Sequence, residues 1–513
     1  MTGRLVITAV WDGLRPDFVT PEVTPVLHGL ASEGVWFGAS HCVYPSETRV
    51  NAAALGTGCG PGRSGITANT IYLPHPHGDG AGLMVNTGDH AHLARLEAAD
   101  GPLLRAPLVG QALRAAGGAM VVASSGSPGS ALLQDPSPDG ITVHAALFRP
   151  EGVERAVLQR FGPPPPDSYP ATGRSDWITQ AFLEYLLPEV LVPVLRAGRP
   201  ALAHWWLTDP DHTAHRRGLG APETVQSLRE NDARLGRLMA HLDELGLLAR
   251  TDVLLTSDHG FSTPGPPPGP GRDFDAALVA AGLKEGPQSE DVVSTGQWGG
   301  AITFHPRAVQ RAPAVVRWLQ EQPWVGTVLA RDGGPAAGLP GTLPLSLAWN
   351  GLVGPRAPDL RFGGAWSDAP DETGIPGSIA GGAARAAQGG PAGASRRPGG
   401  PLATHGSASP YDLRNSLFAW GPRSKRRLRS EVPAGIVDVA PTVRHLLGLP
   451  ASPGDGRVLH EALAGGPDPA RLEVTRSVHE GAVRWPGGGF RQRLRRVAVE
   501  GASYLEGIDT ERS

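Results

Sequence analysis

Residues 201–260 read ALAHWWLTDPDHTAHRRGLGAPETVQSLRENDARLGRLMAHLDELGLLARTDVLLTSDHG. The stretch opens with a mostly apolar run, 201–207, in which His204 is the one polar residue, and such a run is typical of a buried strand. Residues 223–247 then place leucines on one face at helical spacing, and 253–256 is a second short apolar run. A strand, a helix and a second strand in this order predict one unit of a parallel α/β sheet.

The same alternation continues on both sides of that stretch. Apolar runs at 5–10, 35–43 and 119–123 predict further strands, while 48–55 and 108–116 have the composition of helices. We therefore expect an α/β protein whose mostly parallel sheet is flanked by helices on both faces. The pattern resumes after residue 405 and continues through 437–449, but the C-terminal part is too weakly patterned to assign.

Two low-complexity stretches divide the chain. Residues 264–271 consist of Pro and Gly, and 374–400 consist mostly of Gly, Ala, Pro and Arg, so neither can form a packed core. Short apolar runs between them suggest a smaller inserted, cap-like subdomain. The predicted organisation is the first part of the α/β core at 1–263, the inserted subdomain at 264–373, a disordered loop at 374–400 and the remainder of the core at 401–513.

The composition of the 513 residues excludes several classes of protein. Hydrophobic residues make up 40% and charged residues 19%, which is enough apolar material for a sizeable core. A formal charge of −3 gives no basic field for a nucleic-acid polymer or an anionic membrane. Two cysteines cannot form a disulfide framework, no run reaches 18 apolar residues, and the N-terminal run is too short for a signal peptide. These features predict a cytoplasmic protein and leave its oligomeric state open.

Polar side chains follow the predicted strands at the points where those strands end. Because the carboxyl ends of parallel strands meet at one edge of a sheet, we expect these side chains to gather there. Three Asp, three His and one hydroxyl supply the nitrogen and oxygen ligands that would hold two divalent cations and that suit zinc. The residues are Asp12, Thr48, Asp211, His215, Asp258, His259 and His405.

Each of these residues taken alone has an ordinary structural explanation. Asp12 with the following glycine is typical of a turn, Thr48 suits a helix N-cap, and His405 suits a loop. Asp211 and His215 are four positions apart and would share a helix face. It is their joint order along the chain that favours a metal site.

In that order the residues resemble the alkaline phosphatase superfamily and, within it, the type I phosphodiesterase/nucleotide pyrophosphatase family. The resemblance rests on short motifs, and 437–449 is similar to the family's closing helix. Matches run from about residue 5 to 450, so an alkaline-phosphatase-like fold is implied for most of the chain. The motifs are Asp-Gly (12–13), Pro-x-x-Thr with Asn (45–51), Thr-Gly with Pro (57–61), Gly-Ile-x-x-Asn (65–69), Pro-Asp-x-x-x-His (210–215), Ser-Asp-His-Gly (257–260) and Thr-His-Gly (404–406).

The resemblance implies two metal sites and a covalent mechanism. Thr48 would attack phosphorus to form a phosphothreonine, which water would then hydrolyse. The backbone N–H of Thr48 and the side-chain amide of Asn69 would hold a non-bridging oxygen. One zinc ion would be held by Asp211, His215 and His405. The other would be held by Asp12, Thr48, Asp258 and His259.

Three positions depart from the family's pattern. Arg49 stands where nucleotide-cleaving members have an aromatic residue, Val50 where a proline is usual, and Ser64 where a histidine is usual. Arg49 would contact an anionic leaving group or the phosphate, or would be a solvated arginine of the first helical turn.

The function implied is metal-dependent hydrolysis of phosphodiester or pyrophosphate bonds in a small-molecule substrate. Three alternatives remain open from the sequence: a phosphonate hydrolase of the phosphonoacetate type, a phosphomonoesterase, and a non-catalytic relative that binds phosphate or metal. Competent residues at all seven ligand and nucleophile positions argue against the last of these.

Overall fold

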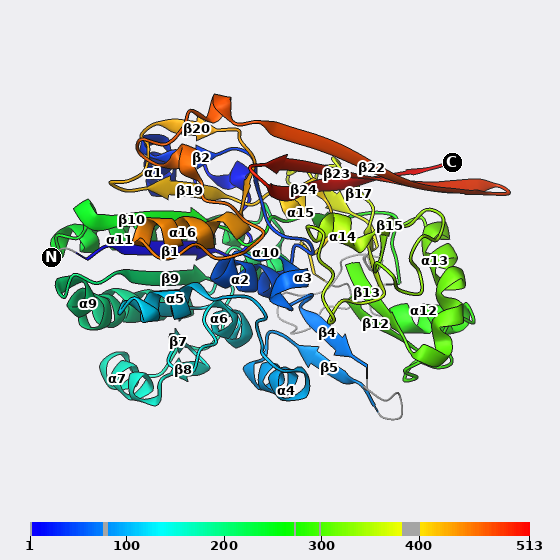
Figure 1. The fold of residues 1–513 in the computed structure, drawn as a ribbon, viewed down its shortest axis with the longest axis horizontal. Coiled ribbons are helices and arrows are strands. Elements are labelled where there is room, and N and C mark those ends of the chain that lie inside the picture. Colours follow the sequence, from blue (N-terminus) through cyan, green and yellow to red (C-terminus); the bar gives the residue numbers. More distant parts are fainter. Residues whose placement is uncertain (1–2, 75–80, 271–272, 297–298, 382–400) are drawn as a thin grey trace.

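Seven consecutive buried residues, Leu5–Trp11, form strand β1 at the middle of a nine-stranded sheet (Figure 1). The computed structural model describes residues 3–74, 81–270, 273–296, 299–381 and 401–513. In spatial order the strands of this sheet are β20 (Leu428–Ser430), β2 (Val35–Phe37), β19 (Leu417–Trp420), β10 (Thr251–Thr256), β1, β9 (Ala201–Leu207), β6 (Ala119–Ser124), β7 (Ile141–His144) and β8 (Leu147–Arg149).

The central strands are parallel, and their first residues lie opposite one another. Leu5 lies opposite both Thr251 of β10 and Ala201 of β9, and the pairs β6–β9 and β6–β7 are parallel as well. Strand β19 runs antiparallel between β10 and β2, and β8 runs antiparallel to β7. The sheet is therefore mixed but mostly parallel, and the predicted α/β fold class is confirmed.

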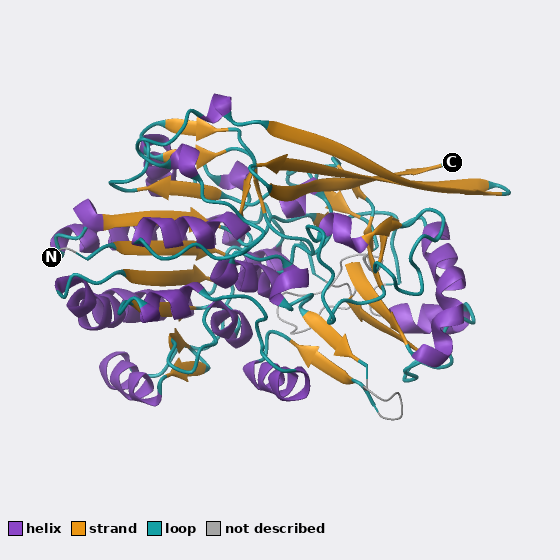
Figure 2. Cartoon of the chain, in the orientation of Figure 1, coloured by secondary structure: helices purple, strands orange, loops and turns teal. Residues whose placement is uncertain are grey.

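Helices cover both faces of this sheet, as Figure 2 shows. Alternate side chains of β1 point to opposite faces. Val6 and Val10 pack with α2 (Thr48–Thr57), α5 (Val109–Ala115) and α16 (Val439–Leu447). Leu5 and Ile7 pack with α11 (Pro222–Glu244) and with the helical run 172–196 on the other face. Burial on both faces explains why β1 is apolar except at Thr8.

The helical run 172–196 comprises α8 (Thr172–Ala181), a π-helical segment (Phe182–Leu191) and α9 (Val192–Arg196). By length and composition it could cross a membrane, because an 18-residue window within it has a mean hydropathy of 1.4. Phe182, Leu186 and Leu187 are fully buried against the sheet, however, as in a helix of a protein core.

A second, smaller sheet lies beside the carboxyl ends of the central strands (Figure 1). It has its own apolar core with α12 (Phe274–Ala280) and α13 (Ala312–Glu321). The predicted boundaries at 263/264 and 373/374 remain predictions. Of the predicted loop 374–400, residues 382–400 lie outside the described part, whereas Ser378–Ile379 form strand β18. The strands of this sheet are, in order, β12 (Val292–Gly296), β13 (Gly299–Phe304), β16 (Leu360–Gly364), β14 (Val325–Ala330) and β15 (Leu343–Pro344).

The C-terminal residues form a long three-stranded antiparallel sheet of β22 (Val474–Trp485), β23 (Gly488–Val499) and β24 (Ala502–Arg512). Val497 packs into the core of the large sheet, whereas Phe490 on the same strand packs into the core of the smaller one. This C-terminal sheet therefore packs against both the nine-stranded sheet and the smaller five-stranded sheet.

Candidate metal centre

The carboxyl ends of β1, β9 and β10 carry the acidic residues of a polar cluster. Asp12 follows β1 directly, Asp211 is the first residue of α10 (Asp211–Arg217), and Asp258 and His259 follow β10. Because these three parallel strands are in register, residues just beyond them leave the sheet side by side. The expectation that polar side chains gather at this edge agrees with the structure.

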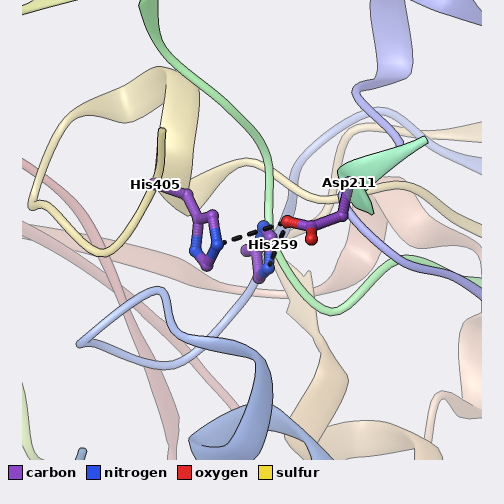
Figure 3. A group of neighbouring side chains, drawn as sticks. All are labelled: Asp211, His259 and His405. Atoms are coloured by element: carbon purple, nitrogen blue, oxygen red, sulfur yellow. Dashed lines mark ion pairs between the residues drawn. The ribbon is translucent and has the colours of Figure 1, made fainter. Parts of the chain in front are cut away.

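The remaining predicted residues come from three other segments. Thr48 is the first residue of α2, His215 lies one turn after Asp211 on α10, and His405 comes from a loop before α15 (Pro410–Leu413). Figure 3 shows the side chains of His259 and His405 directed toward Asp211. The structure thus brings together all seven proposed ligand and nucleophile residues.

Two groups within the cluster have the composition and spacing of metal sites, and His259 belongs to both. Asp211, His259 and His405 form one group, and Asp12, Asp258 and His259 form the other. His259 Nε2 lies 3.2 Å from Asp258 Oδ2, 3.4 Å from Asp12 Oδ1 and 3.8 Å from Asp211 Oδ1. His215 Nε2 and His405 Nε2 lie 3.2 Å and 3.3 Å from the same Asp211 Oδ1.

Backbone carbonyls fix the orientation of all three histidines. Nδ1 of His215 donates to the carbonyl of Ala403 at 2.8 Å, and Nδ1 of His259 donates to that of Gly260 at 2.8 Å. Nδ1 of His405 similarly pairs with the Ser46 carbonyl at 2.7 Å. When such a ring is neutral, its proton is on Nδ1. The lone pair of Nε2 then points toward the carboxylates, as in metal-ligating histidines.

The carboxylates of the cluster strongly perturb one another. Burial, together with the charges of Asp258 and Asp211, raises the pKa of Asp12 well above its usual value. Burial likewise raises the pKa of Asp258 to about 7. Burial alone would lower the pKa of His405, but its pairing with Asp211 raises it to about 9. The folded chain therefore gathers acidic groups where water is excluded, and burial and mutual repulsion favour the protonated form of Asp12 and Asp258 unless a cation offsets their charge.

A cation fits this donor set. Asp12 Oδ1, Asp211 Oδ1 and Asp258 Oδ2 are buried and make no hydrogen bond within the described residues, although each faces a histidine nitrogen. An imidazole lone pair opposite a carboxylate oxygen leaves both acceptors unsatisfied unless a proton or a metal ion lies between them. Oxygen and nitrogen donors of this kind match zinc and similar divalent cations.

Thr48 lies at the edge of both groups. Its Oγ1 is 3.2 Å from Nε2 of the shared His259, and its side chain is almost fully buried. As the first residue of α2, its backbone N–H is among those that lack an intrahelical partner. Asn69 Oδ1 accepts the backbone N–H of Arg49 at 3.1 Å, which leaves the Asn69 amide hydrogens as donors beside Thr48.

Three residues that support the cluster were not predicted. Trp206 Nε1 donates to Asp12 Oδ2 at 3.0 Å. Glu47 accepts the backbone N–H of Asn69 and pairs with the buried Arg361 of β16 at 3.1 Å. Trp206 lies in the quoted strand 201–207, but nothing in an apolar run marks which side chain donates a hydrogen bond. Arg361 is 314 positions from Glu47, and no local motif connects them.

Two cavities open on either side of Thr48, and Thr48, Arg49 and Asp211 line both. The first, of about 410 Å³, extends over Asn69 toward Arg361 and the smaller sheet. The second, of about 530 Å³, extends toward 125–128, 144–146 and 164–167.

Comparisons with known proteins agree with this arrangement. The sequence model of type I phosphodiesterase/nucleotide pyrophosphatase matches residues 6–307. No curated protein matches the sequence. The fold is similar to that of murine ectonucleotide pyrophosphatase/phosphodiesterase 5, solved as an inactive Thr→Ala variant in complex with AMP, with a TM-score of 0.59, 17% identity and coverage of 90% of this chain and 100% of the murine chain. The fold is also similar to that of human ectonucleotide pyrophosphatase/phosphodiesterase 5, with a TM-score of 0.57 and 18% identity. That match covers 89% of this chain and 99% of the human chain.

Proposed function

The chain belongs to the type I phosphodiesterase/nucleotide pyrophosphatase family of hydrolases, and on that premise we propose that it hydrolyses phosphodiester or pyrophosphate bonds through a phosphothreonine on Thr48. The observation that carries the proposal is the position of Thr48 Oγ1, 3.2 Å from Nε2 of the histidine that both Asp/His groups share. A hydroxyl at that position has access to both groups, as a nucleophile in a two-metal site requires.

Two divalent cations, zinc in our proposal, would lower the pKa of the attacking hydroxyl and neutralise charge on the phosphoryl oxygens. Asp211, His215 and His405 would hold one of them. Asp12, Asp258, His259 and Thr48 would hold the other. Trp206 would keep Asp12 oriented through its hydrogen bond to Oδ2, and the backbone carbonyls would keep each histidine Nε2 available.

In the first step Thr48 Oγ1 forms a bond to phosphorus while the bond to the leaving alcohol or phosphate breaks. The backbone N–H of Thr48 and the amide of Asn69 donate to a non-bridging oxygen, where negative charge develops. Glu47 holds the backbone of Asn69, so that the amide donor is positioned before substrate binds. Water then cleaves the phosphothreonine and restores the hydroxyl.

The two cavities support a substrate with organic groups on both sides of phosphorus. Thr48 lies where the cavities meet, so a diester or pyrophosphate would place one substituent in each. The AMP complex of the murine relative supports a nucleotide as one class of substrate. Arg49 in place of an aromatic residue nevertheless favours a different contact from base stacking.

A substrate panel with metal analysis on the same sample tests this function. We expect bis(4-nitrophenyl) phosphate to be turned over faster than 4-nitrophenyl phosphate or phosphonoacetate. Activity should be lost after chelation and restored by zinc, with close to two equivalents of metal per chain. Faster release of phosphate from phosphonoacetate or from the monoester would instead support a phosphonate hydrolase or a phosphomonoesterase. Metal-replete protein without turnover of any of the three would contradict the proposal.

A further inference from the structure

Next to the candidate nucleophile, Arg49 carries a guanidinium that no described residue pairs with. It is the second residue of α2, half-buried, and its Nε is buried without a hydrogen-bond partner in the described part of the chain. Its terminal nitrogens make no hydrogen bond or ion pair within the described ranges, and they remain accessible. Buried polar groups normally have partners, so the partner of this guanidinium is expected to come from outside the chain.

The backbone at Gly88 fixes where the guanidinium lies. A Cβ added to Gly88 would lie 2.8 Å from Arg49 Nη2, so the arginine packs closely against a residue without a side chain. The N–H of Gly88 is held in turn by Asn86 Oδ1 at 3.0 Å. Among the residues described, no carboxylate of the metal cluster lies within ion-pair distance of Arg49. The guanidinium therefore lines both cavities without an ion pair to the described carboxylates of the metal cluster.

Other arginines that line the two cavities are already neutralised. Arg361 pairs with Glu47 at 3.1 Å, and Arg174 pairs with Asp167 at 3.3 Å. His144 also lines the second cavity, but burial lowers its pKa to about 4 and keeps it neutral. Arg49 is thus the one arginine without a carboxylate partner among the described residues that line either cavity.

We propose that Arg49 binds a second anionic group, a carboxylate or a phosphate, on an organic arm of the substrate. This inference rests on the proposed function and specifies its substrate class as an ester whose arm carries its own negative charge. The planar guanidinium matches both anions, and its accessible terminal nitrogens are free to donate hydrogen bonds to either of them.

Matched substrates test the proposal. Ethyl 4-nitrophenyl phosphate has an uncharged arm, and its 2-carboxyethyl and 2-phosphooxyethyl analogues add one anionic group of each kind. We expect Arg49→Met to lower kcat/KM for the charged substrates about 10–100-fold, which is the range for hydrogen bonds to charged groups, and to change the uncharged one less than threefold. Arg49→Lys should retain part of the preference. As a control for loss of one positive charge, Arg95→Met changes an exposed arginine of α4 (His90–Asp100).

An equilibrium measurement decides the same question without turnover. Calorimetry would compare ethylphosphonate with 2-carboxyethylphosphonate and 2-phosphooxyethylphosphonate. Wild-type protein should bind at least one charged ligand about tenfold more tightly than ethylphosphonate, and Arg49→Met should lose that difference. Equal effects of the substitution on charged and uncharged compounds would overturn the proposal, because Arg49 would then act on the group that all of them share. If wild-type protein hydrolysed no ester at all, the proposed function would be wrong, while the phosphonate comparison would still decide the role of Arg49.

Discussion

Replacing Thr48 with alanine should remove the proposed nucleophile and leave the other six proposed metal ligands in place. The side chain is buried, and its Oγ1 has one hydrogen-bond partner within the described part of the chain, Nε2 of His259. Alanine is the best helix former and suits the first turn of α2. His259 keeps its bond to the Gly260 carbonyl, so its ring should stay in position. We therefore expect the fold and both Asp/His groups to be retained.

The size of the kinetic effect follows from the geometry. In the proposed mechanism Thr48 would lie next to phosphorus, and a well-oriented intramolecular nucleophile acts at an effective molarity of about 10⁵–10⁸ M, against about 55 M for water. If water attacks phosphorus directly in the variant, kcat should fall roughly 10³–10⁶-fold. The remaining rate would come from the cations and from the Asn69 and backbone donors, which the substitution leaves unchanged.

The assay combines three measurements on one preparation. Single-turnover hydrolysis of bis(4-nitrophenyl) phosphate gives the rate, acid quenching with peptide mass spectrometry detects phosphothreonine, and elemental analysis gives the metal content. Thr295→Ala is the matched control because Thr295 lines the same cavity from the smaller sheet. A Thr48→Ala rate within tenfold of wild type, with metal retained, would refute the covalent mechanism and favour direct attack by water.

Three further substitutions test other parts of the argument. His215→Ala removes a nitrogen 3.2 Å from Asp211 Oδ1 and should lower the bound metal by about one equivalent. His460→Ala changes an exposed histidine and should leave the metal content unchanged. Equal metal contents in the two variants would contradict the ligand assignment. Asn69→Ala should lower kcat about 10²–10³-fold at unchanged metal content, and a loss below threefold would exclude it as an oxyanion donor. His204 is buried in β9, and burial lowers its pKa to about 4. Since the unfolded histidine takes up a proton near pH 6.5 and the folded one does not, stability should fall as pH drops from about 6.5 to 4, by up to about 3 kcal/mol. The melting temperature of His204→Leu should therefore depend less on pH over that range, and parallel curves would show that the burial argument is wrong.

The central sheet could be predicted because its strands are buried on both faces. The mostly apolar run at 201–207 corresponds to β9 residue for residue, and the predicted helix at 223–247 is α11, Pro222–Glu244. The long C-terminal sheet could not be predicted, because most of β22 is exposed and carries no apolar pattern. Its pairing with β23 is set by neighbouring strands and the cores beneath them rather than by local periodicity.

Some residues of the candidate site are marked by short local motifs, whereas others reach it only through contacts between distant parts of the chain. Asp12, Asp258 and His259 lie within three residues of the ends of β1 and β10, so short motifs at strand ends were enough to find them. The ion pair of Glu47 with Arg361 joins α2 to the smaller sheet across 314 positions, and only the folded chain reveals it. Sequence motifs were therefore informative about the proposed metal ligands and much less informative about the residues that line the cavities around them.

That division also explains why substrate preference is the harder property to predict. The proposed metal ligands lie at the edge of a rigid parallel sheet, where the fold itself determines their spacing. The cavity walls come instead from loops and from the smaller sheet, which can vary without moving the ligands. Arg49 is the exception because it is the neighbour of Thr48 in sequence as well as in space. A single departure from the family's pattern at that position changes the charge of both cavities at once, while the catalytic groups beside it stay the same.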